Sequence, residues 1–343
     1  MAYTTIDNPG LFFNTVLYTG NGTTNTAQTG VGFQPDWTWI KSRSTSDYNH
    51  FVFDAVRGAT KYVKTDANSA ENTLAESLKS FDTDGFTVGT ESDVNNNSTT
   101  YASWNWKANG SGSSNSDGTI SSTVSANTTA GFSIVSYTGT GSNATVGHGL
   151  GAVPKMIFFK DRETAVDWGV YAEPNGNTKE MYLSTTDAAG TITNAFNSPT
   201  PPSSVFTIGT SSRYNPSSKG VIAYCFADVK GYSKIGGYTG NNNADGTFVY
   251  TGFRPAWVMT KITSASDGWM LFDNKRNPHN VMDKYMTADG VGGDSTRDSI
   301  DFVSNGFKLR VANGDCNNGS YAYLAFAEAP FVTEGTKAAG TAR

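Results

Sequence analysis

The sequence predicts an all-β fold made of three tandem β-sandwich domains, jelly-roll-like in type, that arose by internal triplication. Three observations favour this fold. Aromatic residues make up 13% of the 343 residues, and Gly, Asn, Ser and Thr are abundant, which is typical of strands and turns. Short segments of alternating character are separated by turns. One pattern of such segments occurs three times along the chain.

The repeat is anchored on a tripeptide and a ten-residue motif. The tripeptide Tyr-Thr-Gly occurs at 18–20, 137–139 and 238–240. The motif reads GFQPDWTWIK at 32–41, GAVPKMIFFK at 151–160 and GFRPAWVMTK at 252–261, and its Pro follows the Gly of the tripeptide by 15 residues each time. From the Tyr of the tripeptide to the last aromatic residue of the copy, the distance is 88, 89 and 88 residues. Such regular spacing indicates a triplicated unit.

Each copy is expected to contain the same strands in the same order. The motif forms a strand that begins near Pro, whose missing N–H costs least at a strand start. An aromatic hairpin arm follows, then a turn with a short strand, then a closing strand. These three segments lie at 51–53, 84–89 and 101–106, at 168–170, 204–209 and 221–226, and at 269–272, 305–310 and 321–326. The only helical structure predicted is a short turn at 71–79.

Alternation along these strands predicts which side chains are buried. In the closing strand one set of alternate residues is larger and more apolar, and it should face the core. The same argument applies to the motif strand. The predicted inward set is Trp37, Trp39, Ala102, Trp104, Trp106, Met156, Phe158, Ile222, Tyr224, Phe226, Trp257, Met259, Ala322, Leu324 and Phe326. Cys225 lies on the opposite face and is interpreted as a small filler without a redox role.

Each copy is expected to fold as a domain with its own core. The predicted domains are residues 1–108, 131–229 and 230–330. Residues 109–130 are rich in Gly, Ser, Asn and Thr, which predicts a flexible or extended linker. Residues 331–343 lack an apolar pattern and are predicted to be a tail. Domains that pack together and domains strung out like beads are both compatible with this spacing.

Two groups of residues are candidates for surface interactions. Lys41, Asp54 and Arg57 recur as Lys261, Asp273 and Arg276, whereas the second copy has Ala172-Glu173 in place of the Asp. A cluster of this kind binds anions or sugars, or else it is an ion pair that fixes a loop at the rim of the sandwich. The ion pair is the preferred interpretation. Trp168 and Trp269, at the start of the hairpin arm, are weak candidates for surface contacts.

No catalytic, cofactor-binding or metal-binding residues are predicted. The segment Asp82-Thr-Asp-Gly85 imitates half of a calcium loop, but a hairpin turn with Asp-Gly explains the whole pattern and is the preferred interpretation. Three histidines, His50, His148 and His279, fall at non-equivalent points of the copies and accompany no known catalytic motif. Two cysteines cannot form a disulfide framework. We therefore expect a protein that is not an enzyme and carries no cofactor.

Charge and hydropathy exclude two classes of partner. The net charge is −5 and the pI is near 5.2, without the basic patches that nucleic acids or anionic membranes require. No apolar run approaches the length that spans a membrane. The N-terminal segment MAYTTIDNPGLFF has neither the positive region nor the apolar region of a signal peptide. Neither nucleic-acid binding nor membrane insertion is expected.

From Ala2 to Ala108 the first copy contains the segments AYTTIDNPGLFF, LYTGNG, GFQPDWTWIKSR, NHFVFDAVRGATK, FDTDGFTVG and YASWNWKA. In these segments it resembles a repeat domain of tailed-bacteriophage proteins that is common among marine phages. The second and third copies keep the spacing but share fewer identical residues with these segments, and the second copy lacks the Asp-x-x-Arg element. The resemblance implies a structural role in a virion or a tail fibre, and it supplies no catalytic residues.

We therefore expect a virion surface protein, either a short tail fibre or a decoration of the head or tail, that contacts host glycans. Its expected partners are other virion proteins and further copies of itself, a homotrimer being the form that suits such appendages. It is expected to be made in the host cytoplasm and to reside in the virion. One alternative is a carbohydrate-binding adhesin, which needs an export signal. Another is a polysaccharide depolymerase, which needs a carboxylate pair in a groove.

Overall fold

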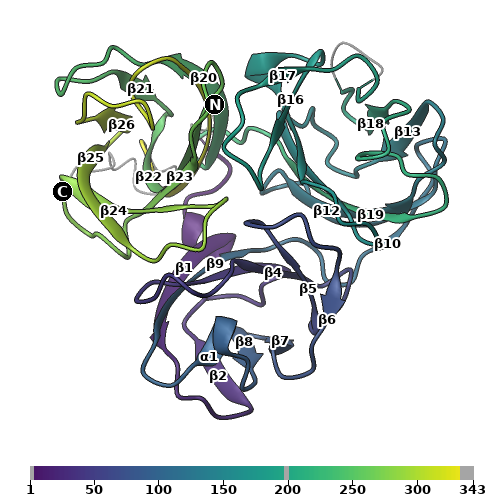
Figure 1. The fold of residues 1–343 in the computed structure, drawn as a ribbon, viewed down its shortest axis with the longest axis horizontal. Coiled ribbons are helices and arrows are strands. Elements are labelled where there is room, and N and C mark those ends of the chain that lie inside the picture. Colours follow the sequence, from purple (N-terminus) through teal and green to yellow (C-terminus); the bar gives the residue numbers. More distant parts are fainter. Residues whose placement is uncertain (1–3, 197–200, 333–343) are drawn as a thin grey trace.

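The fold is all-β, with several antiparallel sheets, as predicted. The computed structural model describes residues 4–196 and 201–332. Three lobes surround a common centre, which gives the molecule a triangular outline (Figure 1). We call residues 4–108 lobe 1, residues 109–229 lobe 2 and residues 230–332 lobe 3. None of the described helices is long and apolar enough to cross a membrane.

Lobe 1 has a six-stranded sheet of order β1-β9-β3-β4-β5-β6 and a three-stranded sheet of order β2-β8-β7. Its strands are β1 (Phe13–Thr19), β2 (Thr26–Thr29), β3 (Trp37–Ser42), β4 (Phe51–Asp54), β5 (Lys61–Lys64), β6 (Asn72–Thr73), β7 (Leu78–Asp82), β8 (Gly85–Val88) and β9 (Thr100–Trp106). The short helices η1 (Pro9–Leu11) and α1 (Ser92–Asn95) lie before β1 and before β9.

Lobe 2 has an eight-stranded sheet of order β10-β11-β12-β19-β14-β15-β16-β17 and the pair β13-β18. Its elements are β10 (Ser113–Asn115), β11 (Ser122–Asn127), β12 (Phe132–Thr138), β13 (Ala144–Gly147), β14 (Met156–Asp161), β15 (Gly169–Ala172), η2 (Glu173–Asn175), β16 (Lys179–Tyr182), β17 (Gly190–Thr191), β18 (Val205–Ile208) and β19 (Gly220–Phe226).

Lobe 3 is one sheet of eight strands that curls into a nearly closed, barrel-like form, of order β20-β27-β22-β23-β24-β25-β26-β21. Its strands are β20 (Ser233–Thr239), β21 (Phe248–Tyr250), β22 (Phe253–Ile262), β23 (Trp269–Asp273), β24 (Met282–Thr287), β25 (Ser295–Val303), β26 (Gly306–Leu309) and β27 (Ser320–Pro330).

The three main sheets pair their strands in the same register. The motif strands β3, β14 and β22 run antiparallel to the closing strands β9, β19 and β27. The pairs Trp37↔Trp106, Met156↔Phe226 and Trp257↔Phe326 correspond, as do Lys41↔Ala102, Lys160↔Ile222 and Lys261↔Ala322. Residues at the same place in this register are called equivalent below, which allows the lobes to be compared position by position.

Each lobe has its own hydrophobic cluster, on one face of its main sheet. The clusters include Ile40 and Phe86 in lobe 1, Phe159 and Phe206 in lobe 2, and Val258 and Phe307 in lobe 3. In all three, the short strand that follows the predicted turn covers this face. Cys225 lies in the cluster of lobe 2 and is fully buried. Burial raises the pKa of its thiol, which is consistent with a filler residue.

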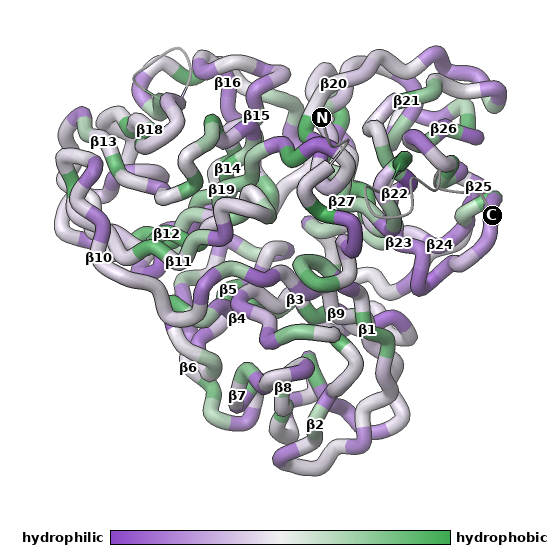
Figure 2. The backbone as a smooth tube through the Cα atoms, turned by 180° about the vertical axis from the view of Figure 1, so that it is seen from behind, coloured by the Kyte–Doolittle hydropathy of each residue, from purple (hydrophilic) through white to green (hydrophobic). Residues whose placement is uncertain are grey.

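A fourth cluster, the largest, lies on the opposite faces of the main sheets and joins all three lobes. It contains the whole set of residues predicted to face inward, so their burial is confirmed. Their place is different from the expectation: they form a core shared between the lobes rather than the private core of each copy. Figure 2 shows hydrophobic stretches along β14, β19, β22 and β27 beside this centre. Both faces of the paired motif and closing strands at the middle of each main sheet are therefore largely buried.

Two local predictions were wrong. Residues 109–130 are not a simple linker, because they contain β10 and β11, and β11 pairs along the outer edge of β12 from Ser122 to Asn127. The N–H and C=O groups of the β12 edge are satisfied in this way. Residues 71–79 form no helix: they hold β6, a single turn in which Ser77 N–H donates to Leu74 O, and the start of β7. Residues 333–343 of the predicted tail lie outside the described residues.

Candidate functional site

The two predicted ion pairs form, but between lobes and not at a rim. Arg57 Nε bonds to the Asp54 carboxylate, and Arg276 Nε bonds to the Asp273 carboxylate. All four side chains are fully buried, with 0% of their surface exposed. The rim position was wrong because the main sheets pack against one another, which covers the ends of β4 and β23. The pairs are thus buried charges at lobe boundaries.

Between lobes 1 and 2 the ion pair extends into a network. Arg57 Nη1 lies 3.3 Å from Glu71 Oε2, and Arg162 Nε of lobe 2 lies 2.8 Å from the same oxygen. Tyr224 of lobe 2 donates its hydroxyl to Asp54 Oδ2 at 2.7 Å. Burial disfavours the Arg57 cation, but Asp54, Tyr224 and Glu71 together outweigh this effect, so the pKa of Arg57 lies above its ordinary value.

The same network recurs between lobes 3 and 1. Arg276 Nη1 lies 2.9 Å from Asp294 Oδ1, and Arg43 Nε of lobe 1 lies 2.9 Å from Asp294 Oδ2. Trp104 of lobe 1 donates its indole N–H to Asp273 Oδ2 at 3.0 Å. Each member occupies a position equivalent to one in the first network. Lobe 1 therefore contacts lobe 2 through the same set of positions that lobe 3 uses to contact lobe 1.

The boundary between lobes 2 and 3 lacks every charged member of this network. The equivalent residues are Ala172, Asn175, Ala189, Thr263 and Leu324. Only the backbone bond is kept: Ala189 N–H donates to Thr263 O at 3.0 Å, as Glu71 N–H donates to Arg162 O at 2.8 Å. The carboxylates, the arginines and the tyrosine of the boundary between lobes 1 and 2 are thus all replaced at the boundary between lobes 2 and 3. Joint replacement is expected if these side chains stabilise one another only as a complete set.

Three equivalent lysines join the lobes in a ring. Each buried ammonium group donates to a carbonyl of its own lobe and to a carbonyl of a neighbouring lobe. The neighbouring acceptors are Val291 O for Lys41, Asn68 O for Lys160 and Thr186 O for Lys261, at 2.8, 3.0 and 2.8 Å. Burial lowers the pKa of all three ammonium groups to about 8. The predicted lysines Lys41 and Lys261 thus bind backbone and do not belong to the Asp–Arg pairs.

Trp168 and Trp269 are not surface residues, contrary to the prediction. They are 0% and 1% exposed. Trp168 Nε1 donates to Lys64 O of lobe 1 at 2.7 Å, and Trp269 Nε1 donates to Tyr182 O of lobe 2 at 2.8 Å. His50 is the equivalent residue of lobe 1 and is also buried. The start of the hairpin arm faces the neighbouring lobe, which is why these indoles are covered.

Sequence reasoning missed several members of these boundaries. Lys160 stands in the motif but lacks the Asp-x-x-Arg partner that drew attention to the other two lysines. Arg43 and Arg162 each follow a motif lysine by two residues. Alignment of the copies by their spacing could therefore have identified them as equivalent residues. Glu71 and Asp294 carry no such signal, because the segments around them differ in length and character.

Asp66→Asn is expected to raise the free energy of unfolding at pH 7.5 by about 1–3 kcal/mol. Burial raises the pKa of the Asp66 carboxyl from 3.8 to about 6, and its Oδ2 atom has no hydrogen-bond partner among the described residues. The stability that the protonated carboxyl contributes is full below pH 3.8 and is lost as the pH rises through about 6. Urea unfolding at pH 4 and pH 7.5 measures this difference.

Asparagine keeps an oxygen for the His50 N–H, which lies 3.3 Å from Asp66 Oδ1. A neutral acceptor is sufficient for this backbone N–H, because in lobe 2 the equivalent N–H, that of Trp168, donates to Ser184 Oγ. The same dependence of stability on pH in the variant and in the parent chain would contradict the assignment.

The predicted turn at Asp82–Gly85 is a hairpin between β7 and β8, since Asp82 pairs with Gly85. The Asp84 carboxylate accepts the N–H groups of Gly30 and Gly32, at 3.2 and 2.6 Å. Among residues 4–196 and 201–332 no group of three His, Cys, Asp or Glu side chains could hold a metal ion. Asp84 thus fixes a neighbouring loop, while the Asp82 carboxylate accepts the hydroxyl groups of Ser80 and Thr87 within the hairpin.

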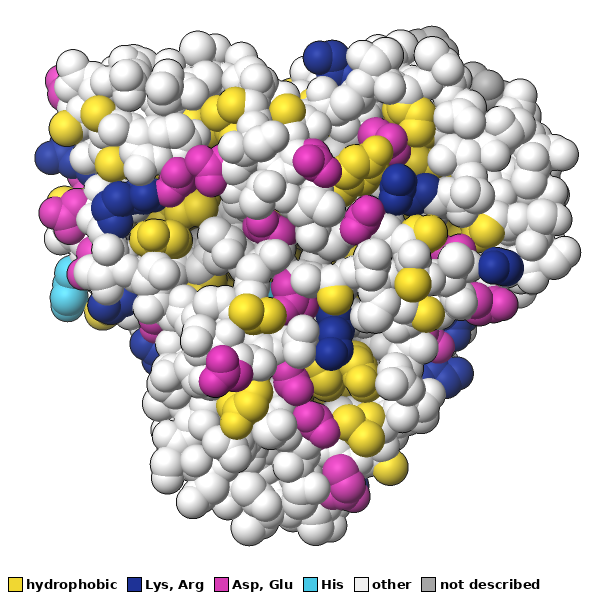
Figure 3. All heavy atoms as spheres, in the orientation of Figure 1, with side chains coloured by type: hydrophobic (Ala, Val, Ile, Leu, Met, Phe, Trp, Pro, Cys, Tyr) yellow, Lys and Arg dark blue, Asp and Glu magenta, His cyan; other side chains and the backbone are white. Residues whose placement is uncertain are grey.

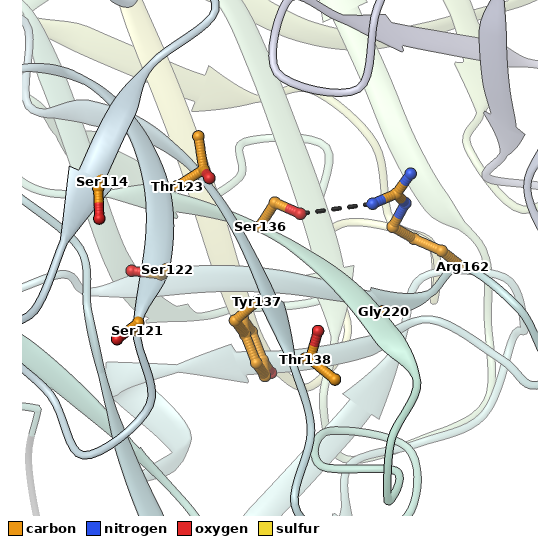
Figure 4. A pocket seen from close by; sticks show the side chains of 9 residues that line it. All are labelled: Ser114, Ser121, Ser122, Thr123, Ser136, Tyr137, Thr138, Arg162 and Gly220. Carbon is orange, nitrogen blue, oxygen red and sulfur yellow. Dashed lines mark hydrogen bonds between the residues drawn. The ribbon is translucent and has the colours of Figure 1, made fainter.

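An open recess of about 300 Å³ lies on lobe 2 (Figure 4). Hydroxyl side chains of β10, β11 and β12 line it, with Arg162 at one side. Arg162 Nη1 lies 3.4 Å from Ser136 Oγ, but its Nε and Nη2 are bound to Glu71. The Tyr137 hydroxyl donates to Tyr214 O. The recess therefore offers neutral hydroxyl groups and no free acid or base for catalysis.

The outer surface shown in Figure 3 carries Lys, Arg, Asp and Glu side chains interspersed, without a patch of one sign on that face. The charge distribution on this face therefore does not indicate a binding site for a charged ligand.

The comparisons with known proteins identify one family. No curated protein and no solved structure matches the chain. One family profile matches residues 8–330, which span all three lobes and the boundaries between them. The chain therefore belongs to the family described as Domain of unknown function (DUF7483).

Proposed function

We propose that this chain is a structural protein of a bacteriophage virion surface, a short tail fibre or a decoration of the head or tail. One observation carries the proposal: the buried Arg–carboxylate networks and the three buried lysines at the lobe boundaries bind groups of a neighbouring lobe. Such use of buried polar groups suits a rigid building block better than an enzyme. The resemblance of the first copy to tailed-phage repeat domains supplies the kind of particle.

The proposal includes the origin of the fold. Each lobe is a β-sandwich of jelly-roll-like type, and the chain is an internal triplication of this unit. Matching strand registers and matching contacts at the boundaries support a common ancestor for the lobes. A single chain then supplies what three subunits supply in a trimeric appendage. The proposed partners are other virion proteins, further copies of the chain and host glycans.

Antibodies raised against the chain test the proposal. They should label intact, purified particles from the host strain that carries the gene, in negative-stain images with gold-conjugated second antibody. The position of the gold distinguishes head, tail and fibre tip. Digestion of exposed proteins with protease before labelling serves as the control for surface location. Purified particles that carry no label, although the chain is detected in the lysate, would contradict the proposal.

The enzyme alternative makes a different prediction. A depolymerase releases reducing ends from capsule or lipopolysaccharide, and its activity disappears when one carboxylate is replaced. We expect no release of reducing ends by the purified chain over hours at pH 5–8. Turnover that is abolished by a single acidic substitution would replace the structural proposal with an enzymatic one.

A further inference from the structure

Two aromatic side chains stand exposed on one strand of lobe 3. Phe248 is 46% exposed and Tyr250 is 57% exposed, while Val249 between them is buried at 6%. Residues two apart on a strand point to the same face, so both rings lie side by side on the outside of β21. Figure 1 places β21 and β26 in the outer part of this lobe, away from the shared centre. Most other aromatic rings of the described chain are buried.

The other two lobes lack this pair. The register of β21 with β26 makes Ala27 and Thr29 of lobe 1 the equivalents of Phe248 and Tyr250. In lobe 2 the equivalents are Thr145 and Gly147. The residues between them, Gln28 in lobe 1 and Val146 in lobe 2, are buried, while the outward positions carry small residues. The fold therefore needs no aromatic residue on the outward face. The rings of lobe 3 are an addition to a common framework.

The strands beside β21 complete a shallow platform. Tyr250 pairs with Gly306, which pairs on its other side with Val303. A Cβ atom at residue 306 would lie 3.1 Å from Phe248 Cε2 and 2.1 Å from Val249 O, so only glycine fits beneath the Phe248 ring. Because Gly306 has no side chain, no group projects from the sheet between Val303 and Tyr250. The result is an exposed apolar area that contains the Phe248 and Tyr250 rings.

Polar groups at the margin of this area are already neutralised. Lys308 lies opposite Phe248 on the same face, and its Nζ atom is 2.7 Å from Asp245 Oδ1. Arg310 Nε lies 3.3 Å from Asp301 Oδ2, and Asp301 is the partner of Lys308 in β25. Each cation has an anion beside it, so the margin presents hydrogen-bonding groups without excess charge. A neutral polar ligand suits this margin.

We propose that the outer face of β21, β25 and β26 binds a neutral glycan, whose sugar rings stack on Phe248 and Tyr250. The C–H groups on one face of a pyranose carry small positive charge, and aromatic faces attract them through their negative quadrupole. The hydroxyl groups at the edge of the sugar then reach Lys308 and Asp245. This inference rests on the proposed function, because it assigns the host-glycan contact of that proposal to named residues.

The size of the area favours a glycan over a protein. A stable protein interface buries roughly 800 Å² on each partner and needs a well-packed centre. Two half-exposed rings provide only a fraction of that area, which matches one or two sugar residues. The paired charges at the margin also provide no excess charge for an acidic or basic protein to complement.

The test begins with an array of neutral bacterial-surface oligosaccharides, followed by isothermal titration of the captured sugar. The variant Phe248→Ala with Tyr250→Thr copies the pair of lobe 1 and should weaken binding at least tenfold without changing the melting temperature. The control is Leu11→Ala with Val291→Ala, which removes exposed apolar side chains from other places and should leave binding unchanged. The reverse change, Ala27→Phe with Thr29→Tyr, should not disturb folding.

Capture of no neutral sugar by the parent chain would overturn the inference, and so would unchanged binding by the Ala/Thr variant. Self-association that the Ala/Thr variant abolishes in sedimentation experiments would assign the face to a second copy and would also overturn it. Gold labelling of particles is independent of these results. A labelled particle with no glycan binding rejects the glycan site alone, whereas unlabelled particles reject the proposed function.

Discussion

Trp106→Ala is expected to lower the free energy of unfolding by about 3–5 kcal/mol, which is the range for removal of a large aromatic side chain from a packed core. The side chain is fully buried in the cluster shared by the lobes. Its ring contacts Phe13 and Trp37 of lobe 1 at centroid distances of 4.8 and 4.3 Å, and Trp257 and Phe326 of lobe 3 at 5.7 and 5.6 Å.

The loss is expected to come from packing alone. Trp106 Nε1 has no hydrogen-bond partner among the described residues, so alanine leaves no acceptor unsatisfied. Four rigid rings from two lobes surround the site and cannot collapse into the space, which places the cost in the upper part of the range. Because the cavity opens between lobes, a single cooperative transition at lower temperature is expected, rather than early melting of lobe 1.

Differential scanning calorimetry and urea unfolding measure the effect. Leu11→Ala, at an exposed position, should change stability by less than about 0.5 kcal/mol. Trp168→Ala should cost as much as Trp106→Ala, since it also leaves Lys64 O without its donor. Early melting of one lobe, with the other two unaffected, would contradict the shared core.

The sequence was sufficient to predict the strands and the residues that face inward, because period-two alternation and tandem spacing are local signals. It could not tell which core those residues enter. In the strand Trp37–Ser42 every residue is buried, including the polar Thr38 and Ser42, so neither of its faces is exposed to solvent. Trp37 and Trp39 enter the shared core while Ile40 enters the cluster of lobe 1. Composition alone does not distinguish an inward face from a face that meets another lobe.

The same limit explains the residues assigned to the surface. Polar residues at the end of β4 and aromatic residues at the start of β15 and β23 read as exposed when one lobe is considered alone. Their burial is a property of the assembly of lobes. The repeat itself held the missing signal: Asp54, Ala172 and Asp273 are equivalent, and so are Tyr224, Leu324 and Trp104. An acid occurs where the facing residue is a donor, and alanine occurs where it is leucine.

That pairing leads to the second large effect. Arg57→Ala is expected to lower the free energy of unfolding by about 3–5 kcal/mol, because it leaves the buried Asp54 carboxylate without its cation. Asn175→Ala, at the equivalent position of lobe 2, is the matched control and should cost less than about 1 kcal/mol.

A combined variant separates the network from its single members. It carries Asp54→Ala, Arg57→Asn, Glu71→Ala, Arg162→Thr and Tyr224→Leu, which convert the boundary between lobes 1 and 2 into the residue set between lobes 2 and 3. Removal of all the charges together leaves no buried charge unpaired, so the five changes should cost less than Arg57→Ala alone. Urea unfolding of the three variants at pH 7.5 provides the comparison. Additive losses, with the combined variant the least stable, would mean that the charges stabilise the boundary individually and that the neutral boundary evolved by a different compensation.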